Sequence, residues 1–328
     1  MKSGLSFIRP LLKYWEEHPK RDYLDTMERY RSLNAALLER FGQKTYKLAL
    51  DGGFSCPTRD GTLDTRGCIF CLGGSGDFSV PVGKNVREAI ETAKAVVAGK
   101  GAEKYIAYFQ SYTGTYAPLE KLRELYTEAI ENEDILAVDI ATRPDCLPDE
   151  IITLLQELNR IKPVWVELGL QTVHPATAEY IRRGYPLSVY DDAVRRLKTA
   201  GLEVIVHMIL GLPGETKEMM AQTAAYIGAS GADGIKFQLL HVLEGTDLAQ
   251  DYREGRFEVL SLEEYIAALE ECIESIPESM VVHRLTGDGA KRSLLAPLWS
   301  ADKKHVLNAV KAAFERDDVR QGTKVCKK

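Results

Sequence analysis

The chain has 328 residues, with 42 Lys and Arg against 48 Asp and Glu, which gives a formal net charge of −6. No apolar run approaches the ~20 residues that span a bilayer, and Arg9 and Pro10 interrupt the N-terminus before a signal-peptide core could form. We therefore expect a cytoplasmic protein that makes no membrane contact. Six cysteines in such a chain favour metal binding or chemistry over a disulfide framework.

The first 45 residues are predicted to form a helical extension. Six apolar residues recur at steps of three or four before Gly42: Leu24, Met27, Tyr30, Leu33, Leu37 and Phe41. This is the period of an amphipathic helix. We expect the helix to cover one edge or end of the core.

Short apolar strands then alternate with helices. Strands are predicted over 46–50, 105–109, 135–141, 164–170, 204–210 and 234–240, and helices over 86–97, 118–130, 148–158, 215–229 and a stretch that ends at Gly201. Six such units indicate an α/β protein with a parallel sheet covered by helices. The sheet could be an open (β/α)6 barrel or a doubly wound sheet, and in both architectures function gathers at the C-terminal ends of the strands.

A cysteine-rich loop follows the first predicted strand, over residues 52–78. Cys56 and Cys68 are separated by eleven residues, and Cys68 and Cys71 by two, among many glycines and aspartates. Three close thiolates bind soft metals. A closed structural zinc site needs four ligands, whereas three suit a four-iron cluster that leaves one iron free. Two alternatives remain: a zinc loop with Cys146 or His207 as a distant fourth ligand, and three unrelated buried thiols.

This loop resembles that of the radical S-adenosylmethionine (SAM) superfamily. The eleven-residue spacing, together with Pro-Thr-Arg-Asp-Gly over 57–61 and Gly-Cys-Ile-Phe-Cys over 67–71, is similar to the elongator catalytic subunit and, more closely, to the YhcC-like branch. The resemblance implies a partial (β/α)6 TIM-type barrel over residues 46–280, with a helical N-terminal extension over 1–45 and a basic C-terminal extension over 281–328. It also implies a [4Fe-4S] cluster on Cys56, Cys68 and Cys71, bound SAM, and an external electron donor such as flavodoxin or ferredoxin.

The resemblance further implies a SAM-binding set, all at the ends of predicted strands. Phe70 would lie beside the adenine, and Ser111, Tyr112 and Thr113 replace the family's glycines in the segment that binds the SAM amino group. Gln171 and Arg183, twelve residues apart, would hold the carboxylate and ribose. His207 would contact the ribose, and backbone groups near Val242 and Leu243 would pair with the adenine edge. The family often has a glutamate where Ala141 stands, so that contact is missing or supplied elsewhere.

Cys146 follows the third predicted strand, near the expected mouth of the barrel. Its thiol could act catalytically as a radical relay, a hydrogen donor or a covalent nucleophile. A lone cysteine is more commonly a small buried hydrophobic residue, and the sequence leaves both interpretations open.

The implied activity is reductive cleavage of SAM followed by hydrogen abstraction from a substrate. Residues 1–45 carry nine Lys and Arg against six Asp and Glu, and residues 281–328 carry eleven against five, so basic ends flank an acidic body. This pattern favours a tRNA that docks on the ends over the barrel mouth, although solvated surface charge would look the same. A small metabolite or peptide substrate stays open, as does a zinc-stabilised, non-enzymatic binding module.

We expect Cys56→Ala, Cys68→Ala and Cys71→Ala each to lose the cluster and SAM cleavage, because three thiolates are the smallest set that anchors it. Cys272→Ala and Cys326→Ala are the controls and should keep their iron. Iron and sulfide analysis after anaerobic purification measures this, with about four of each expected per unaltered chain. Loss of iron in Cys272→Ala with retention in Cys56→Ala would contradict the assignment.

Overall fold

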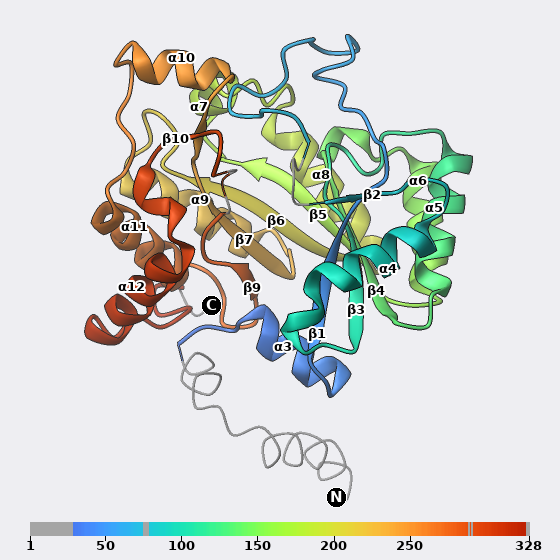
Figure 1. Cartoon of the computed structure of the whole chain (residues 1–328). Helices are drawn as coiled ribbons and strands as arrows, with labels where there is room; N and C mark the ends of the chain where they lie inside the picture. The colour runs from blue at the N-terminus through green and yellow to red at the C-terminus, as the bar shows by residue number, and fades with distance from the viewer. Residues whose placement is uncertain (1–28, 75–78, 288, 290, 326–328) are drawn as a thin grey trace, which may run out of the picture.

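The computed structural model describes residues 29–74, 79–287, 289 and 291–325. Leu24 and Met27 of the predicted N-terminal helix, and Cys326, lie outside these residues. Within them the predicted α/β class is confirmed, because parallel strands alternate with helices along most of the chain (Figure 1).

Eight parallel strands form the main sheet, in the order β2–β1–β3–β4–β5–β6–β7–β9. They are β1 (Thr45–Asp51), β2 (Val80–Pro81), β3 (Lys104–Phe109), β4 (Ile135–Thr142), β5 (Val164–Gln171), β6 (Glu203–Leu210), β7 (Gly234–Leu239) and β9 (Val281–Arg284). Apart from β2, spatial order follows chain order, without the reversal that defines a doubly wound sheet. The sheet is therefore a partial barrel, as the resemblance implied.

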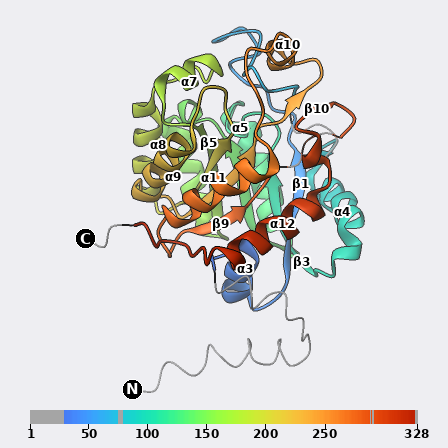
Figure 2. The ribbon, with the colours of Figure 1, turned by 90° about the vertical axis from the view of Figure 1, so that its left-hand side faces the viewer.

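Helices cover the outer face of this sheet (Figure 2). They are α4 (Val86–Val97), α5 (Leu119–Glu131), α6 (Asp149–Asn159), α8 (Leu187–Thr199), α9 (Lys217–Ala229) and α11 (Leu262–Glu274). The shorter helix α7 (Pro175–Tyr180) follows β5, and its Tyr180 packs with the apolar cluster around Ile69. Local signals set their starts: the Thr216 side chain accepts from the Met219 amide, and Ser261 and Glu264 form a reciprocal capping box. Gly201, at φ +75°, lies just after α8, where the sequence predicted a cap.

Short strands were missing from the six predicted units. The two-residue β2 is too short to show a hydrophobic period, and β9 lies in the predicted C-terminal extension yet pairs in parallel with β7. A separate antiparallel pair joins β8 (Val242–Leu243) to β10 (Leu294–Ala296). The division at residues 280 and 281 stays a prediction, although the extension supplies a strand of the main sheet.

Side chains on the inner face of the barrel change from apolar to charged along the strand direction. Its floor is an apolar group of buried residues from the strands and from α3 (Leu33–Phe41): Leu37, Ile106, Ala137, Trp165 and Ile205. The helix α3 therefore covers the end of the barrel where the strands begin. Further toward the C-terminal ends of the strands, the inner face becomes charged.

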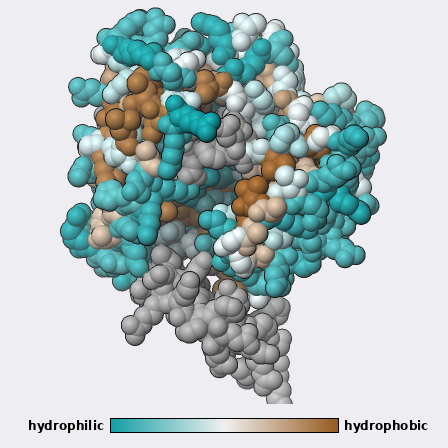
Figure 3. All heavy atoms as spheres, in the orientation of Figure 1, coloured by the Kyte–Doolittle hydropathy of each residue, from teal (hydrophilic) through white to brown (hydrophobic). Residues whose placement is uncertain are grey.

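The C-terminal helix α12 (Lys303–Arg316) belongs to the same core as the sheet. Its buried residues Val306, Val310, Ala313 and Phe314 pack into the main hydrophobic cluster. No helix in the described ranges is long and apolar enough to cross a membrane. On the face seen in Figure 3, hydrophobic residues gather in limited patches within a largely hydrophilic surface.

The described parts of the two chain ends meet where the strands begin. The Gln321 amide donates to the Arg29 carbonyl at 2.8 Å, and Ser32 forms a bridge with Val282. The cysteine loop lies at the opposite end of the barrel (Figure 1). The expectation that both basic ends flank the mouth is therefore wrong for these parts; only the stretch around β10 reaches the mouth, because it pairs with β8.

Candidate active site

The residues predicted from the sequence come together at the C-terminal ends of the strands. The cysteine loop follows β1, the segment Ser111–Thr113 follows β3, and Gln171 ends β5. The Thr113 amide donates to the Ser55 carbonyl at 3.3 Å, so the segment after β3 contacts the cysteine loop directly. The shared end of a parallel sheet thus gathers groups that are far apart in the chain.

The three loop cysteines are free thiols and partly buried. The Cys56 thiol lies 3.1 Å from Thr58 Oγ1, and the Cys68 thiol donates to the Arg182 carbonyl at 3.7 Å. The Cys71 amide donates to the Cys68 carbonyl at 3.0 Å, which closes the turn between them. Burial raises the pKa of Cys68 to about 12, although the nearby Arg143 opposes this shift.

Among the described side chains, no three His, Cys, Asp or Glu residues meet as ligands of one metal ion. A four-iron cluster makes a different demand, since each thiolate binds its own iron and the sulfurs stand further apart. Of the two suggested fourth zinc ligands, His207 is held by bonds to Glu167 and Gln238, and the Cys146 thiol donates to Asp145. Three soft donors on one loop therefore fit a cluster better than a zinc ion.

Arg183 is buried without a carboxylate partner in the described residues. Its side chain is 4% exposed and donates to the carbonyls of Thr172 at 2.6 Å and Tyr185 at 3.1 Å. Burial lowers its pKa, and no acidic side chain is among the groups that act on it. A buried guanidinium charge is costly until an anion pairs with it, so this position suits a ligand carboxylate.

Two further polar atoms at the mouth are buried and unsatisfied. Gln171 has a positive φ of 70°, and its side-chain Oε1 has no hydrogen-bond partner. The Thr113 Oγ1 is orphaned in the same way. Tyr112 also has a positive φ, of 54°, but its side chain is 39% exposed. Buried polar atoms are normally paired, so these two are open to a bound group.

An apolar surface borders the loop on the side of β8. Phe70 packs against a cluster that includes Ile69, Leu240 and Val242. The Leu243 carbonyl accepts from the Thr246 amide at 3.2 Å and from its hydroxyl at 2.7 Å. Both lone pairs of that oxygen are thus used within the protein, and the predicted adenine contact must use other backbone groups near Val242.

Cys146 is buried in the short 3₁₀ turn Pro144–Cys146 after β4. Its thiol donates to Asp145 Oδ1 at 3.7 Å, and burial raises its pKa to about 12. A covalent nucleophile needs the thiolate, so this environment disfavours that role. The hydrogen-donor and radical-relay roles need no thiolate and stay predictions.

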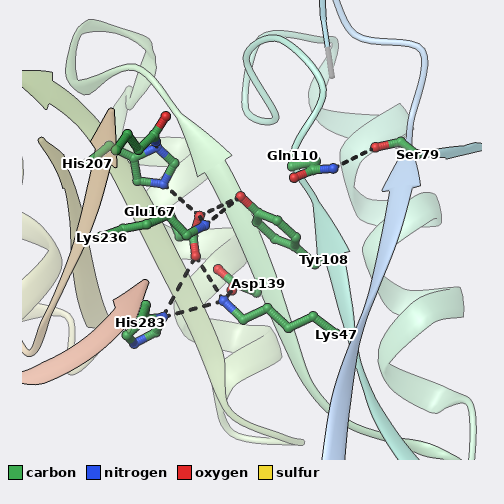
Figure 4. Close-up of polar contacts among 10 residues, drawn as sticks. Lys47, Ser79, Tyr108, Gln110, Asp139, Glu167, His207, Lys236 and His283 are labelled. Atoms are coloured by element: carbon green, nitrogen blue, oxygen red, sulfur yellow. Dashed lines mark hydrogen bonds and ion pairs between the residues drawn. The ribbon is translucent and has the colours of Figure 1, made fainter. Parts of the chain in front are cut away.

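Below the mouth lies a charged cluster that the sequence interpretation missed. Glu167 is fully buried, and its carboxylate accepts from side chains on four other strands (Figure 4). The donors are Lys47 at 2.9 Å, Tyr108 at 2.7 Å, His207 at 2.7 Å and Lys236 at 2.5 Å. Lys236 also donates to the Tyr108 hydroxyl at 2.8 Å. Because β3 and β7 are far apart in the sheet order, this contact requires a curved sheet.

His207, predicted to contact ribose, is held within this cluster. Burial and the Lys236 charge lower its pKa to about 4, so the ring is neutral near pH 7. The Gln238 amide donates to its Nδ1 at 2.9 Å, which leaves the proton on Nε2 to donate to Glu167. The side chain is 15% exposed, so its ribose contact stays a prediction.

Asp139 and Glu167 are two buried carboxylates with opposite pKa shifts. Burial and the neighbouring Glu167 raise the pKa of Asp139 to about 7. Burial alone would raise the pKa of Glu167 as well, but Lys236 and Lys47 hold it well below its usual value. Glu167 is therefore the fixed charge of the cluster, and Asp139 is the group that titrates near neutrality.

Comparisons with known proteins agree with this geometry. Residues 65–227 match the Radical SAM superfamily and residues 232–316 match the Radical_SAM C-terminal domain. The protein YtqA of Bacillus subtilis is 43% identical over 92% of this chain and 94% of its own length. The protein YhcC of Escherichia coli is 38% identical over 81% of this chain and 86% of its own.

This chain belongs to the radical SAM superfamily. It is a radical SAM enzyme of the YhcC-like branch, which is related to Elp3. The structure of Elp3 from Methanocaldococcus infernus shares the fold, with a TM-score of 0.64 at 18% identity over 84% of this chain and 64% of that one. A tRNA uridine(34) acetyltransferase of Methanocaldococcus jannaschii is 28% identical over 50% of this chain and 32% of its own length.

Arg183→Ala should weaken SAM binding while the iron content stays the same. Loss of a charge-assisted contact costs on the order of 1.5–3 kcal/mol, or about ten- to a hundred-fold in affinity. Calorimetric titration of the anaerobic protein with SAM measures the change. Arg195→Ala on α8, whose side chain is 67% exposed, is the matched control. Unchanged SAM affinity in Arg183→Ala would remove the ligand role.

Asp139→Asn tests whether the buried Asp139 carboxyl has a raised pKa in the folded chain. The folded chain keeps this proton up to about pH 7, whereas an unfolded Asp releases it near pH 3.9, so the stability it contributes falls as pH rises between these values. The stability advantage of the unaltered chain over Asp139→Asn should therefore shrink from about pH 4 to about pH 7 in urea unfolding and stay level above that pH. Asp192→Asn, at an exposed position, should show no such trend. An advantage that is constant with pH would contradict the assignment.

Proposed function

We propose that Cys56, Cys68 and Cys71 hold a [4Fe-4S] cluster and that SAM binds beside it at the barrel mouth. When bound, this pair supplies reductive cleavage of SAM and a 5′-deoxyadenosyl radical that abstracts hydrogen from a substrate. The observation that carries the proposal is the buried, uncompensated guanidinium of Arg183 on the same side of the barrel as three free thiols.

The residues of the chain divide this task. Arg183 and Gln171 would orient the amino-acid end of SAM, since a guanidinium fork suits a carboxylate. The apolar surface with Phe70 would cover the adenine and exclude water, which protects a reactive radical from quenching. Beneath them, the Glu167 cluster fixes His207 as a neutral ring.

Electrons would enter from an external donor such as flavodoxin or ferredoxin. The cysteine loop reaches the surface beside Cys71, where Leu72 is 44% exposed. Arg59 donates to the Cys71 carbonyl and holds this part of the loop in place. A donor docked here would lie beside the cysteine loop.

We propose tRNA as the substrate class. Support comes from the similarity to a tRNA uridine(34) acetyltransferase over half of this chain. Lys291 and Arg292 are exposed just before β10, on the side of the mouth. A base must leave its stack to reach a buried radical, which favours a single-stranded loop of the tRNA.

Point substitutions test where tRNA docks. A truncated chain is less suitable, because a chain that ended before β9 would lose a strand of the sheet and expose the core that α12 covers. Lys291→Glu with Arg292→Glu should weaken gel-shift binding of bulk tRNA and lower the salt dependence, with a slope change of about 2 for two lost phosphate contacts. The matched control is Lys303→Glu with Lys304→Glu, which are exposed at the start of α12.

Catalysis is measured as 5′-deoxyadenosine formed from SAM by the reduced protein with and without tRNA. Formation that tRNA stimulates supports the substrate class. Two results together would point to a small metabolite or a peptide as the substrate. They are a rate of SAM cleavage that tRNA does not change, and tRNA binding that neither salt nor either double variant changes. A protein that holds one zinc and no iron would overturn the enzyme mechanism proposed here.

A further inference from the structure

Arg143 is a buried, rigidly held cation that the proposed SAM site does not use. It follows β4, is 8% exposed, and donates through Nε and Nη2 to the two oxygens of Asp145 at 2.9 and 2.7 Å. Its guanidinium also lies 5.2 Å from the centre of the Tyr185 ring. A bidentate pair stacked on an aromatic ring fixes both the position and the orientation of the charge.

The backbone at Gly184 locates this charge relative to the thiols. A Cβ added at Gly184 would lie 3.3 Å from Arg143 Nη2, 3.6 Å from Thr58 Cγ2 and 4.0 Å from the Arg182 carbonyl oxygen. Thr58 is the partner of the Cys56 thiol at 3.1 Å, and the Arg182 carbonyl is the acceptor of the Cys68 thiol at 3.7 Å. The Arg143 guanidinium therefore lies beside the groups that position two of the three thiols.

The electrostatics agree with this placement. Burial would lower the pKa of Arg143, but Asp145, Cys68 and Cys56 raise it, so the side chain stays charged at any working pH. In turn, Arg143 is the group that most opposes the burial shift of Cys68. At Gly184 it is the Arg143 end of the ion pair, through Nη2, that approaches the groups positioning the thiols.

Arg143 differs in this respect from Arg183. Arg183 has no carboxylate partner in the described residues and is open to a ligand anion. Arg143 already has one, so its charge belongs to the protein's own framework. Its effect on a neighbouring group is therefore present before any ligand binds.

We propose that Arg143 is a positioning residue that keeps a positive charge beside the cluster and raises its reduction potential, with Asp145 holding that charge in place. The proposal rests on the proposed cluster at Cys56, Cys68 and Cys71. One-electron reduction makes a cluster more negative, so a nearby cation stabilises the reduced form more than the oxidised form. Low exposure leaves this interaction weakly screened by salt. The cluster becomes easier for the external donor to reduce.

The test is a spectroelectrochemical titration of the reconstituted full chain without SAM. Arg143→Gln should shift the potential to more negative values, because a positive charge is lost. Asp145→Asn should shift it to more positive values, because a negative charge is lost. The double variant removes both charges and should fall between the two single variants. A purely structural role would change melting temperature without shifting the potential in opposite directions.

Two comparisons complete the design. Arg143→Lys keeps the charge and should stay closer to the unaltered potential than Arg143→Gln. Arg123→Gln breaks an exposed pair with Glu157, 2.8 Å apart between α5 and α6, and should leave the potential unchanged. If Arg143→Gln fails to fold, the positive shift in Asp145→Asn decides the proposal.

The outcomes separate the two proposals. An unaltered chain that cannot be loaded with a four-iron cluster would overturn the proposed function and this inference with it. A loaded chain whose potential is the same in Arg143→Gln and Asp145→Asn would overturn the inference alone. Opposite shifts in the two single variants would support both.

Discussion

One buried carboxylate on the inner face of the barrel connects five of its strands. Glu167 on β5 accepts from Lys47 on β1, Tyr108 on β3, His207 on β6 and Lys236 on β7. Removing such a charge from water costs several kcal/mol unless its partners surround it. All four donors reach the Glu167 carboxylate only when these strands curve around it. The curvature of the sheet and the pairing of these charges therefore depend on each other. The mouth above, where the thiols and Arg183 gather, is shaped by that curvature.

Backbone hydrogen bonds within the loop fold back the long segment between the first two cysteines. The Leu63 amide donates to the Pro57 carbonyl at 2.7 Å, and the Gly67 amide donates to the Thr58 carbonyl at 2.8 Å. The eleven intervening residues thus fold back on themselves, and the chain re-enters beside the point where it left. Gly67 adopts φ +74°, where a side chain would also collide with Arg59. The eleven residues lengthen the loop, while its two ends stay close together.

The six main strands and the site of the cysteine loop were predictable because hydrophobic period and turn residues are local signals. The Glu167 cluster was not predicted, since Lys47 and Glu167 are 120 residues apart and nothing local shows which charges meet. A signal was present in the single charged residue within each apolar strand at Lys47, Asp139 and Lys236. His207 was singled out through the resemblance, as a ribose contact, and its partners in the structure come from strands that the sequence could not align. The roles of Gln171 and Arg183 toward SAM stay predictions; the unpaired Oε1 of Gln171 and the Arg183 charge without a carboxylate partner agree with them.

The position of β9 also affects the order of events on the ribosome. The cysteine loop leaves the ribosome with the first strand, whereas β9 and α12, which complete the sheet and the core, follow roughly 200 residues later. During that interval the thiols belong to a nascent chain whose sheet still lacks its last strand. The three thiols are therefore exposed with the nascent chain and become partly buried at the barrel mouth only once the later strands and helices have been made.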